Sequence, residues 1–211
     1  MTEIGVAPGA IEKRVALGPL NRWWPVAAGW MITDKPQGLT RLGEKIVVWR
    51  DKNDSVHCVE DRCPHRGARL SMGWNLGDRI ACWYHGVEVG ADGIVKAVPA
   101  VSQCPMVGDN MIKSYPCFEH MGGIFVWFGD ELHKEPEEFE FPEEFESDEW
   151  ASMLCTAHWK CNWTYAVDNV MDPMHGAYLH AVSHSMAEGD TEAKMQIEPT
   201  DTGFIFGKSD Q

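Results

Sequence analysis

The chain has few basic residues for its length. Its 211 residues include 18 Lys or Arg against 32 Asp or Glu, which gives a formal net charge of −14. Such a surface repels phosphate backbones and anionic lipids, so nucleic acid and membrane surfaces are excluded as expected partners. The longest apolar run, Trp23 to Ile32, has about half of the ~20 residues that a membrane span requires. The N-terminus shows no basic segment followed by an apolar core, so we expect no signal peptide and a cytoplasmic protein.

The sequence also lacks a disulfide framework. It contains seven cysteines, an odd number, and two of them belong to a metal motif described below. The other five show no framework spacing, which is typical of free thiols in a reducing compartment. Hydrophobic residues make up 44% of the chain, enough for a sizeable core in one or two domains.

Strand patterns dominate the first two thirds of the sequence. Short β-branched runs separated by Gly, Asp and Asn are typical of hairpins in a small all-β domain. The expected hairpins pair residues 46–50 with 55–59, 86–89 with 94–98, and 112–118 with 123–128. Helical patterns then occupy 159–182, and strand patterns return at 194–207. We predict an α+β chain with four parts: an N-terminal helical segment at 1–20, an all-β domain at 21–129, an acidic linker at 130–150, and the beginning of a second domain at 151–211.

The linker carries most of the negative charge of the chain. Residues 130–149 hold eleven Asp or Glu against one Lys, or ten of the fourteen net charges. Phe139, Phe141 and Phe145 are interspersed among the acids. A solvated connector is favoured over an acidic docking face, because charge runs usually form solvated surface.

The first metal motif has the pattern Cys-x-His, sixteen residues, then Cys-x2-His. It comprises Cys63, His65, Cys82 and His85. Two thiolates and two imidazoles suit zinc, which is one alternative. A Rieske [2Fe–2S] cluster needs two loops that each supply one Cys to one iron and one His to the other, and these two pairs supply that set. Glycines that allow tight turns follow both pairs, which favours the iron–sulfur cluster.

The second motif is Asp168-x3-Asp172-x2-His175-x4-His180. The spacing of the first three residues predicts one stripe on a helix. His180 would point away from His175 on a regular helix, so a bulge or a break near Pro173 is expected. Two His and one carboxylate on one side of iron are typical of non-haem Fe(II) oxygenases. His184 follows in a predicted loop and is not expected to be a ligand.

Together the two motifs, in this order, resemble the α-subunit of Rieske non-haem iron oxygenases, the aromatic ring-hydroxylating family. The resemblance runs from about Trp23 to His180 and includes Cys63–Gly67 (CPHRG) and Cys82–Gly86 (CWYHG). It implies an all-β Rieske domain followed by the beginning of a helix-grip catalytic domain. It also implies cluster ligands at Cys63, His65, Cys82 and His85, and ligands of a mononuclear Fe(II) at His175 and His180.

The resemblance further implies a terminal oxygenase that hydroxylates an aromatic compound with O2. Electrons would come from NAD(P)H through a reductase, with or without a ferredoxin. The catalytic residue Asp172 would bridge a cluster His of one subunit to an iron His of its neighbour, which implies a homotrimer, with or without a separate β-subunit. Asp168 would have a supporting role.

Two alternatives stay open at this point. The same scaffold could act as a monooxygenase or O-demethylase, or the chain could be a Rieske-type electron carrier without catalytic iron. The family's third iron ligand is a carboxylate far downstream and is not expected within these residues. About sixty residues after the linker are also too few to enclose a helix-grip core. We therefore expect the sequence to be part of a longer α-subunit.

Overall fold

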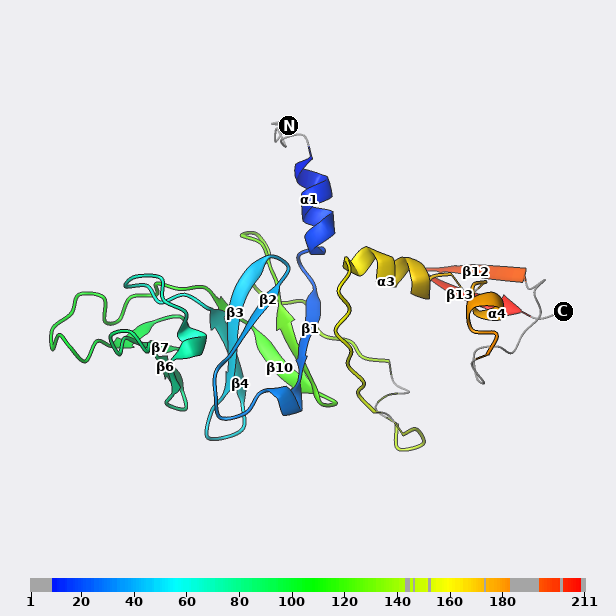
Figure 1. Cartoon of the computed structure of the whole chain (residues 1–211). Coiled ribbons are helices and arrows are strands. Elements are labelled where there is room, and N and C mark those ends of the chain that lie inside the picture. Colours follow the sequence, from blue (N-terminus) through cyan, green and yellow to red (C-terminus); the bar gives the residue numbers. More distant parts are fainter. Residues whose placement is uncertain are drawn as a thin grey trace. The chain divides into compact units, whose positions relative to one another are not determined.

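The computed structural model describes residues 9–142, 145, 147–151, 153–172, 174–182, 194–201 and 203–209. The chain divides into two compact units between His158 and Trp159 (Figure 1). Part of the expected N-terminal helical segment, residues 1–8, and the predicted non-ligand His184 lie outside the described residues.

The first unit contains one α-helix, two short 3-10 turns (η) and eleven strands within its described part. In chain order these are α1 (Ala10–Leu17), β1 (Trp23–Ala28), η1 (Gly29–Met31), β2 (Gln37–Arg41), β3 (Glu44–Arg50), β4 (Val56–Glu60), η2 (Leu70–Met72), β5 (Trp74–Asn75), β6 (Arg79–Ala81), β7 (Glu88–Gly90), β8 (Val95–Ala97), β9 (Ser114–Tyr115), β10 (Cys117–His120) and β11 (Gly123–Trp127).

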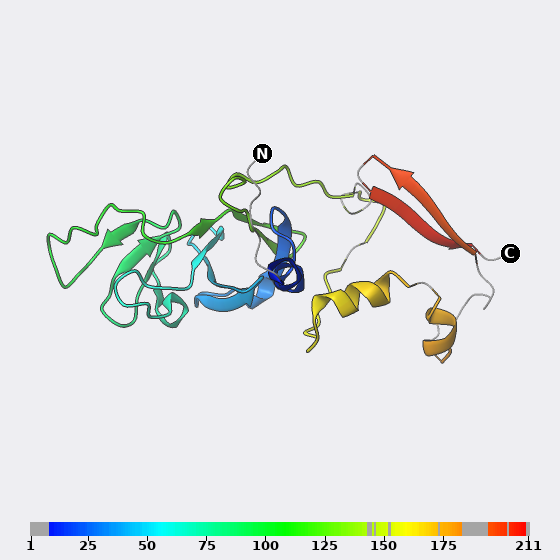
Figure 2. The same ribbon diagram turned by 90° about the horizontal axis from the view of Figure 1, so that it is seen from above.

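Three antiparallel sheets organise these strands, with the orders β1-β11-β10, β2-β3-β4-β9 and β5-β6-β7-β8. Figure 2 shows the β6 and β7 lobe beside the β2-β3-β4 region. The three predicted hairpins are present as β3–β4, β7–β8 and β10–β11. The predicted strand 112–118 is wrong in one respect, because it is two strands in different sheets. Pro116 separates β9 from β10, since proline has no N–H to continue a ladder.

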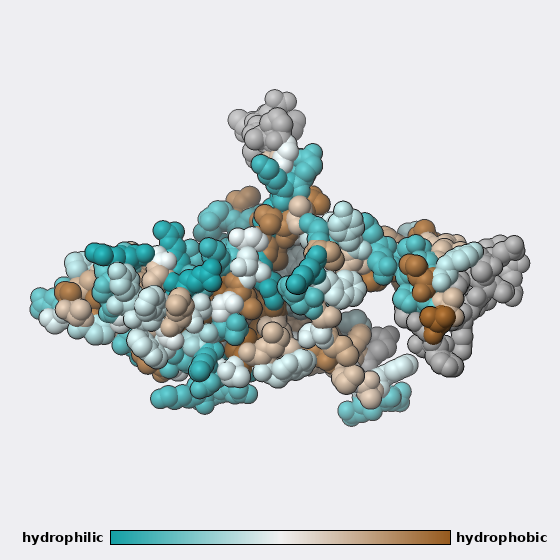
Figure 3. Space-filling model, in the orientation of Figure 1, coloured by the Kyte–Doolittle hydropathy of each residue, from teal (hydrophilic) through white to brown (hydrophobic). Residues whose placement is uncertain are grey.

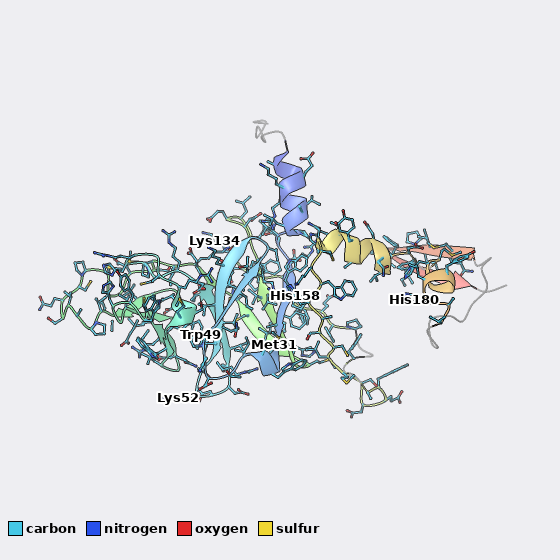
Figure 4. The ribbon with its side chains drawn as sticks, in the orientation of Figure 1. Met31, Trp49, Lys52, Lys134, His158 and His180 are labelled. Atoms are coloured by element: carbon cyan, nitrogen blue, oxygen red, sulfur yellow. The ribbon has the colours of Figure 1, made fainter. Side chains whose placement is uncertain are left out.

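Strand β3 lies at the centre of the unit, and both of its faces are buried. Val47 and Trp49 belong to one core cluster, whereas Ile46 and Val48 belong to the other. This division follows from the two-residue period of a strand. Figure 4 labels Trp49 within this strand, and its Nε1 donates to the carbonyl of Gly77 at 2.9 Å. The continuous apolar run thus joins the two cores of the unit.

The described part of the acidic segment packs on the β1-β11-β10 sheet through its phenylalanines. The ring of Phe139 lies 4.8 Å from that of Phe125 and 4.9 Å from that of Phe118, centroid to centroid. Trp23 Nε1 donates to the carbonyl of Glu137 at 2.9 Å. The intervening glutamates Glu138 and Glu140 are exposed. Alternation of Phe and Glu therefore attaches this segment to the sheet and leaves its charge in solvent.

We expect Phe139→Ala to destabilise the first unit by about 2 kcal/mol. This is below the range for a fully buried phenylalanine because the side chain is half-buried. Urea unfolding followed by tryptophan fluorescence measures the change. Phe145→Ala is the matched control. Because Phe145 is more exposed than Phe139, at 50%, this substitution should cost well under 1 kcal/mol. Equal effects of the two variants would contradict the packing role.

The second unit contains α3 (Trp163–Val170), α4 (Gly176–Leu179), β12 (Lys194–Thr200) and β13 (Gly203–Ser209), the last two paired antiparallel. The predicted helix over 159–182 is therefore shorter and divided. Asn162 caps α3 by accepting the N–H of Thr164 at 3.0 Å, which accounts for its start. Apolar side chains are exposed on this unit, including Leu179 and Phe204. Figure 3 shows brown, hydrophobic surface among the residues of this part of the chain. Among the described helices, none has the length and apolar character needed to cross a membrane.

Candidate metal centres

The two loops of the first motif have the same backbone design. In the first loop, Gly67 N–H donates to the carbonyl of Cys63 at 2.8 Å, and Cys63 N–H donates to Ala68 at 2.7 Å. In the second loop, Gly86 N–H donates to Cys82 at 2.8 Å, and Cys82 N–H donates to the carbonyl five residues later at 2.8 Å. Gly67 and Gly86 have φ of 70° and 72°, a region that other residues rarely adopt. Each Cys-to-Gly segment is thus a turn that only glycine closes without strain.

The loops bring like donors together. Cys63 and Cys82 are 2% and 1% exposed and belong to the same core cluster, and the Cys82 sulfur lies near enough to raise the pKa of the Cys63 thiol. His65 and His85 are exposed, and their ring centroids lie 4.8 Å apart. The structure therefore separates an inner pair of thiols from an outer pair of imidazoles. That is the donor arrangement of a Rieske cluster, in which one iron takes two Cys and the other two His.

The electrostatics of Cys63 fit a bound metal. Burial raises the pKa of the Cys63 thiol, and the adjacent Cys82 sulfur raises it further. Backbone N–H groups of His65 and Arg66 donate to the same sulfur and act in the opposite direction. These donors would stabilise a thiolate, and a coordinated metal ion deprotonates a thiol outright. Without a metal, burial favours the protonated thiol at Cys63, and a coordinated iron would displace that proton.

No group of three or more His, Cys, Asp or Glu side chains gathers around one point in the described part of the chain. A [2Fe–2S] cluster does not require such a group, because each iron takes only two protein ligands. The donors of the first motif form two such pairs, one of thiols and one of imidazoles.

The second motif lies where the helix is interrupted. Helix α3 ends at Val170, and α4 begins at Gly176, with His175 just before it and His180 just after it. The prediction of one helical stripe for Asp168, Asp172 and His175 is wrong, because α3 ends before Asp172. A break in the helix is present, and it lies before His175, while Pro173 itself is outside the described residues. The rings of His175 and His180, which flank the short helix α4, lie 5.2 Å apart between centroids. Figure 4 labels His180 at the end of α4.

The hydrogen bonds of His175 fit an iron ligand. Its Nδ1 lies against the backbone carbonyl of Asp172 and can donate to it. Its Nε2 is buried and has no hydrogen-bond partner in the described structure. A ring that donates from Nδ1 presents the lone pair of Nε2, which is the usual state of a metal-bound histidine. An orphaned buried acceptor is costly, and a metal ion would satisfy it.

The acids of the motif are placed differently from each other. Asp168 is exposed on α3. Asp172 is also exposed, and its Oδ1 accepts the N–H of Met174 at 2.9 Å. The backbone carbonyl of Asp172, and not its carboxylate, contacts His175. The carboxylate therefore remains accessible, as a bridge to a second subunit would require.

Sequence patterns did not mark two features near the first motif. One is a buried carboxylate, Asp61, bonded to Ser71. The other is a group of exposed arginines around the first loop, namely Arg62, Arg66 and Arg69. Residues 62–77 contain these three arginines and no acid. Because the chain as a whole is acidic, a count of charges along the sequence could have identified this basic segment.

Two families match the sequence in the order of the two motifs. The family described as Rieske [2Fe-2S] domain matches residues 22–116. The family described as vanillate O-demethylase oxygenase C-terminal domain matches residues 159–209.

Curated relatives include the vanillate O-demethylase oxygenase subunit of Pseudomonas sp., which is 38% identical over 172 residues, 82% of this chain and 48% of that protein. The terminal oxygenase component of carbazole 1,9a-dioxygenase from Metapseudomonas resinovorans is 30% identical over 187 residues, 87% of this chain and 48% of that protein. The chain thus spans about half the length of the curated relatives it matches.

Solved structures have the same fold. The terminal oxygenase of carbazole 1,9a-dioxygenase from Nocardioides aromaticivorans superposes with a TM-score of 0.74 at 25% identity, covering 92% of this chain and 58% of that one. Dicamba monooxygenase gives a TM-score of 0.74 at 24% identity, covering 90% of this chain and 58% of that one. The predicted α+β class and the resemblance are confirmed. The chain belongs to the Rieske non-haem iron oxygenases, and its relatives are the α-subunits of that family.

Proposed function

We propose that the chain is part of a terminal oxygenase that acts on an aromatic compound with O2. Cys63, His65, Cys82 and His85 would hold the Rieske cluster, and His175 and His180 would supply two ligands to a mononuclear Fe(II). When bound, the cluster supplies single electrons and the mononuclear iron supplies activation of O2. The observation that carries this proposal is the sorting of donors in the first motif, with two thiols buried together and two imidazoles together at the surface.

The residues of this chain have distinct tasks in that reaction. Cys63 and Cys82 would keep one edge of the cluster in the core, away from water. His65 and His85 would place the other edge at the surface, where electrons can enter or leave. The bond from His175 to Asp172 would fix the ring orientation and leave Nε2 for the iron.

Analysis of iron, acid-labile sulfide and zinc in the purified chain, reconstituted without air, tests the cluster. We expect two sulfides per chain and, after reduction, the electron paramagnetic resonance signal of a [2Fe–2S] centre with two histidine ligands. One zinc and no sulfide per chain would refute the proposal in favour of a structural zinc site.

A second candidate reaction is O-demethylation or another monooxygenation. Two observations favour it: the match of residues 159–209 to the vanillate O-demethylase family and the 38% identity to a vanillate O-demethylase subunit. Turnover of vanillate under labelled O2 distinguishes the reactions. Release of formaldehyde, with the aromatic product keeping only the substrate's own oxygens, indicates demethylation, because the oxygen inserted into the methyl group leaves with formaldehyde and the other becomes water. Two labelled oxygens in a cis-diol indicate dioxygenation. The third candidate, an electron carrier, needs no second iron and leaves the orphaned Nε2 of His175 without an explanation.

We also propose that the electron-donor protein binds to the surface around the two cluster loops. Among the relatives is a solved complex between the oxygenase and ferredoxin of carbazole 1,9a-dioxygenase. Here, Trp83 and Tyr84 are 45% and 50% exposed beside His85, and the ring of Tyr84 lies 4.1 Å from it. Arg66 and Arg69 add positive charge to a chain of net −14. An acidic ferredoxin or reductase that receives its electrons from NAD(P)H would complement this surface.

We expect Arg66→Glu to slow reduction of the cluster by an acidic ferredoxin about tenfold at low ionic strength, because steering by opposite charges is lost. Stopped-flow absorbance of the cluster measures the rate. The difference should shrink in 0.5 M salt, since exposed charges are then screened. Lys35→Glu changes the charge equally at another exposed site and serves as the control. Equal slowing by both variants would contradict the assigned surface.

A further inference from the structure

One buried carboxylate lies two residues before the first cluster cysteine. Asp61 is 4% exposed and is the one charged side chain that is buried among the described residues. Its Oδ1 accepts the backbone N–H of Ser71 and its Oδ2 accepts the Ser71 hydroxyl, both at 2.7 Å. A buried carboxylate without such bonds would be strongly destabilising. The two hydrogen bonds explain how the charge is accommodated at this place.

This pair closes the base of the first cluster loop. Asp61 directly follows β4, and its N–H donates to the carbonyl of Lys45 in β3 at 2.9 Å. Ser71 lies in η2, next to Leu70, which is fully buried in the same core cluster as Cys63. The loop from residue 63 to residue 70 therefore begins and ends at one hydrogen-bonded contact, here called the Asp61–Ser71 clasp.

Strand β2 covers the clasp. A Cβ on Gly38 would come within 2.6 Å of Ser71 Oγ and 3.1 Å of Asp61 Oδ2, so only glycine leaves room for the clasp there. Asp61 lines a cavity together with Lys45, Arg62 and Arg69, but none of these cations forms an ion pair with it among the described residues. Hydrogen bonds to Ser71 thus disperse the negative charge of the Asp61 carboxylate, and no ion pair neutralises it within the described residues.

We propose that the Asp61–Ser71 clasp sets the reduction potential of the cluster. This inference rests on the proposed cluster site. Potentials of iron–sulfur clusters depend on nearby charge, on hydrogen bonds and on solvent exposure. A buried negative charge makes addition of an electron less favourable, and low surrounding polarity strengthens its field. Asp61 is not a ligand; it lies at the base of the loop that carries Cys63 and His65 and acts on the cluster through its charge.

For two variants we predict shifts of the reduction potential in opposite directions, measured by redox titration of the cluster-loaded chain. Asp61→Asn keeps the shape and one acceptor oxygen but removes the charge, so the potential should rise. We expect the ratio of reduced to oxidised cluster at a given poise to increase about tenfold, which is 59 mV for a one-electron couple. Ser71→Ala keeps the charge and removes a donor that disperses it, so the potential should fall. Asp34→Asn removes an exposed carboxylate elsewhere and should leave the potential unchanged.

Shifts of the same sign in both variants would overturn the proposal, because a merely structural disturbance has no reason to follow the sign of the charge. An unchanged potential in Asp61→Asn would overturn it as well. If that variant takes up no cluster, Ser71→Ala decides: a lowered potential supports the clasp and an equal or raised potential refutes it. The unsubstituted chain distinguishes failure of this inference from failure of the proposed function. If it shows no [2Fe–2S] signal, the proposed function itself is refuted.

Discussion

Cys63→Ser is expected to abolish the [2Fe–2S] cluster and to leave the fold of the first unit in place. The thiol lies in the core with Cys82, and its sulfur accepts two backbone N–H groups. A serine hydroxyl is nearly isosteric but is a much poorer ligand for iron, and soft thiolates are what iron–sulfur clusters select. One iron would keep a single protein ligand. Visible absorption, sulfide content and the resonance signal should therefore all disappear together, while far-ultraviolet circular dichroism is retained.

Cys104→Ser is the matched control for this result. Cys104 is a half-buried free thiol in the same unit and lies outside both cluster loops. Its replacement should leave iron and sulfide content unchanged. If Cys63→Ser still contained two sulfides, the cluster would be bound by ligands other than Cys63, and the assignment of this ligand would be wrong.

Local signals in the sequence were sufficient for most of the first unit. The three hairpins follow from β-branched runs with turn residues between them, and both strands of each turn lie close in sequence. The two cluster loops follow from Cys, His and Gly at fixed spacing. The division of 112–118 at Pro116 was missed, although the proline itself was visible, because a change of sheet depends on partners far away in the chain.

The helix break illustrates a different limit. The i+5 spacing of His175 and His180 indicated that a regular helix could not bring both rings together, and Pro173 indicated where it could break. The sequence did not show that α3 would end as early as Val170 and leave Asp172 outside it. Helix ends depend on capping and on tertiary contacts that local patterns specify only weakly.

The Asp61–Ser71 clasp could not have been predicted from spacing. Asp and Ser ten residues apart are common, and nothing in the sequence distinguishes a buried carboxylate from an exposed one. Its burial results from β2, where Gly38 approaches the pair from a strand more than twenty residues earlier. Long-range packing of this kind decides which polar groups leave the solvent.

His175→Ala is expected to remove the mononuclear iron from the complete enzyme while the cluster remains. The ring has a buried Nε2 without a hydrogen-bond partner in the described structure, and a histidine 5.2 Å away between ring centroids. Iron per subunit should fall by one, sulfide should stay at two, and the oxygenase turnover measured for the unsubstituted enzyme should become undetectable. His158→Ala replaces an exposed histidine outside the motif and should change none of the three quantities. Loss of sulfide together with iron would show a general failure to fold and not loss of a ligand.

Asp172→Ala makes the complementary test, because it separates the carboxylate from the backbone of the same residue. The carbonyl that faces His175 Nδ1 is retained in this variant, so the ring should keep its orientation and the iron should stay bound. Removing the carboxylate should nevertheless lower turnover about 10- to 100-fold or more, as loss of an outer-shell partner typically does. Bound iron with an intact cluster spectrum and little turnover would place Asp172 in the path between the two centres. Unchanged turnover would assign the whole contribution of this residue to its backbone carbonyl and remove the bridging role.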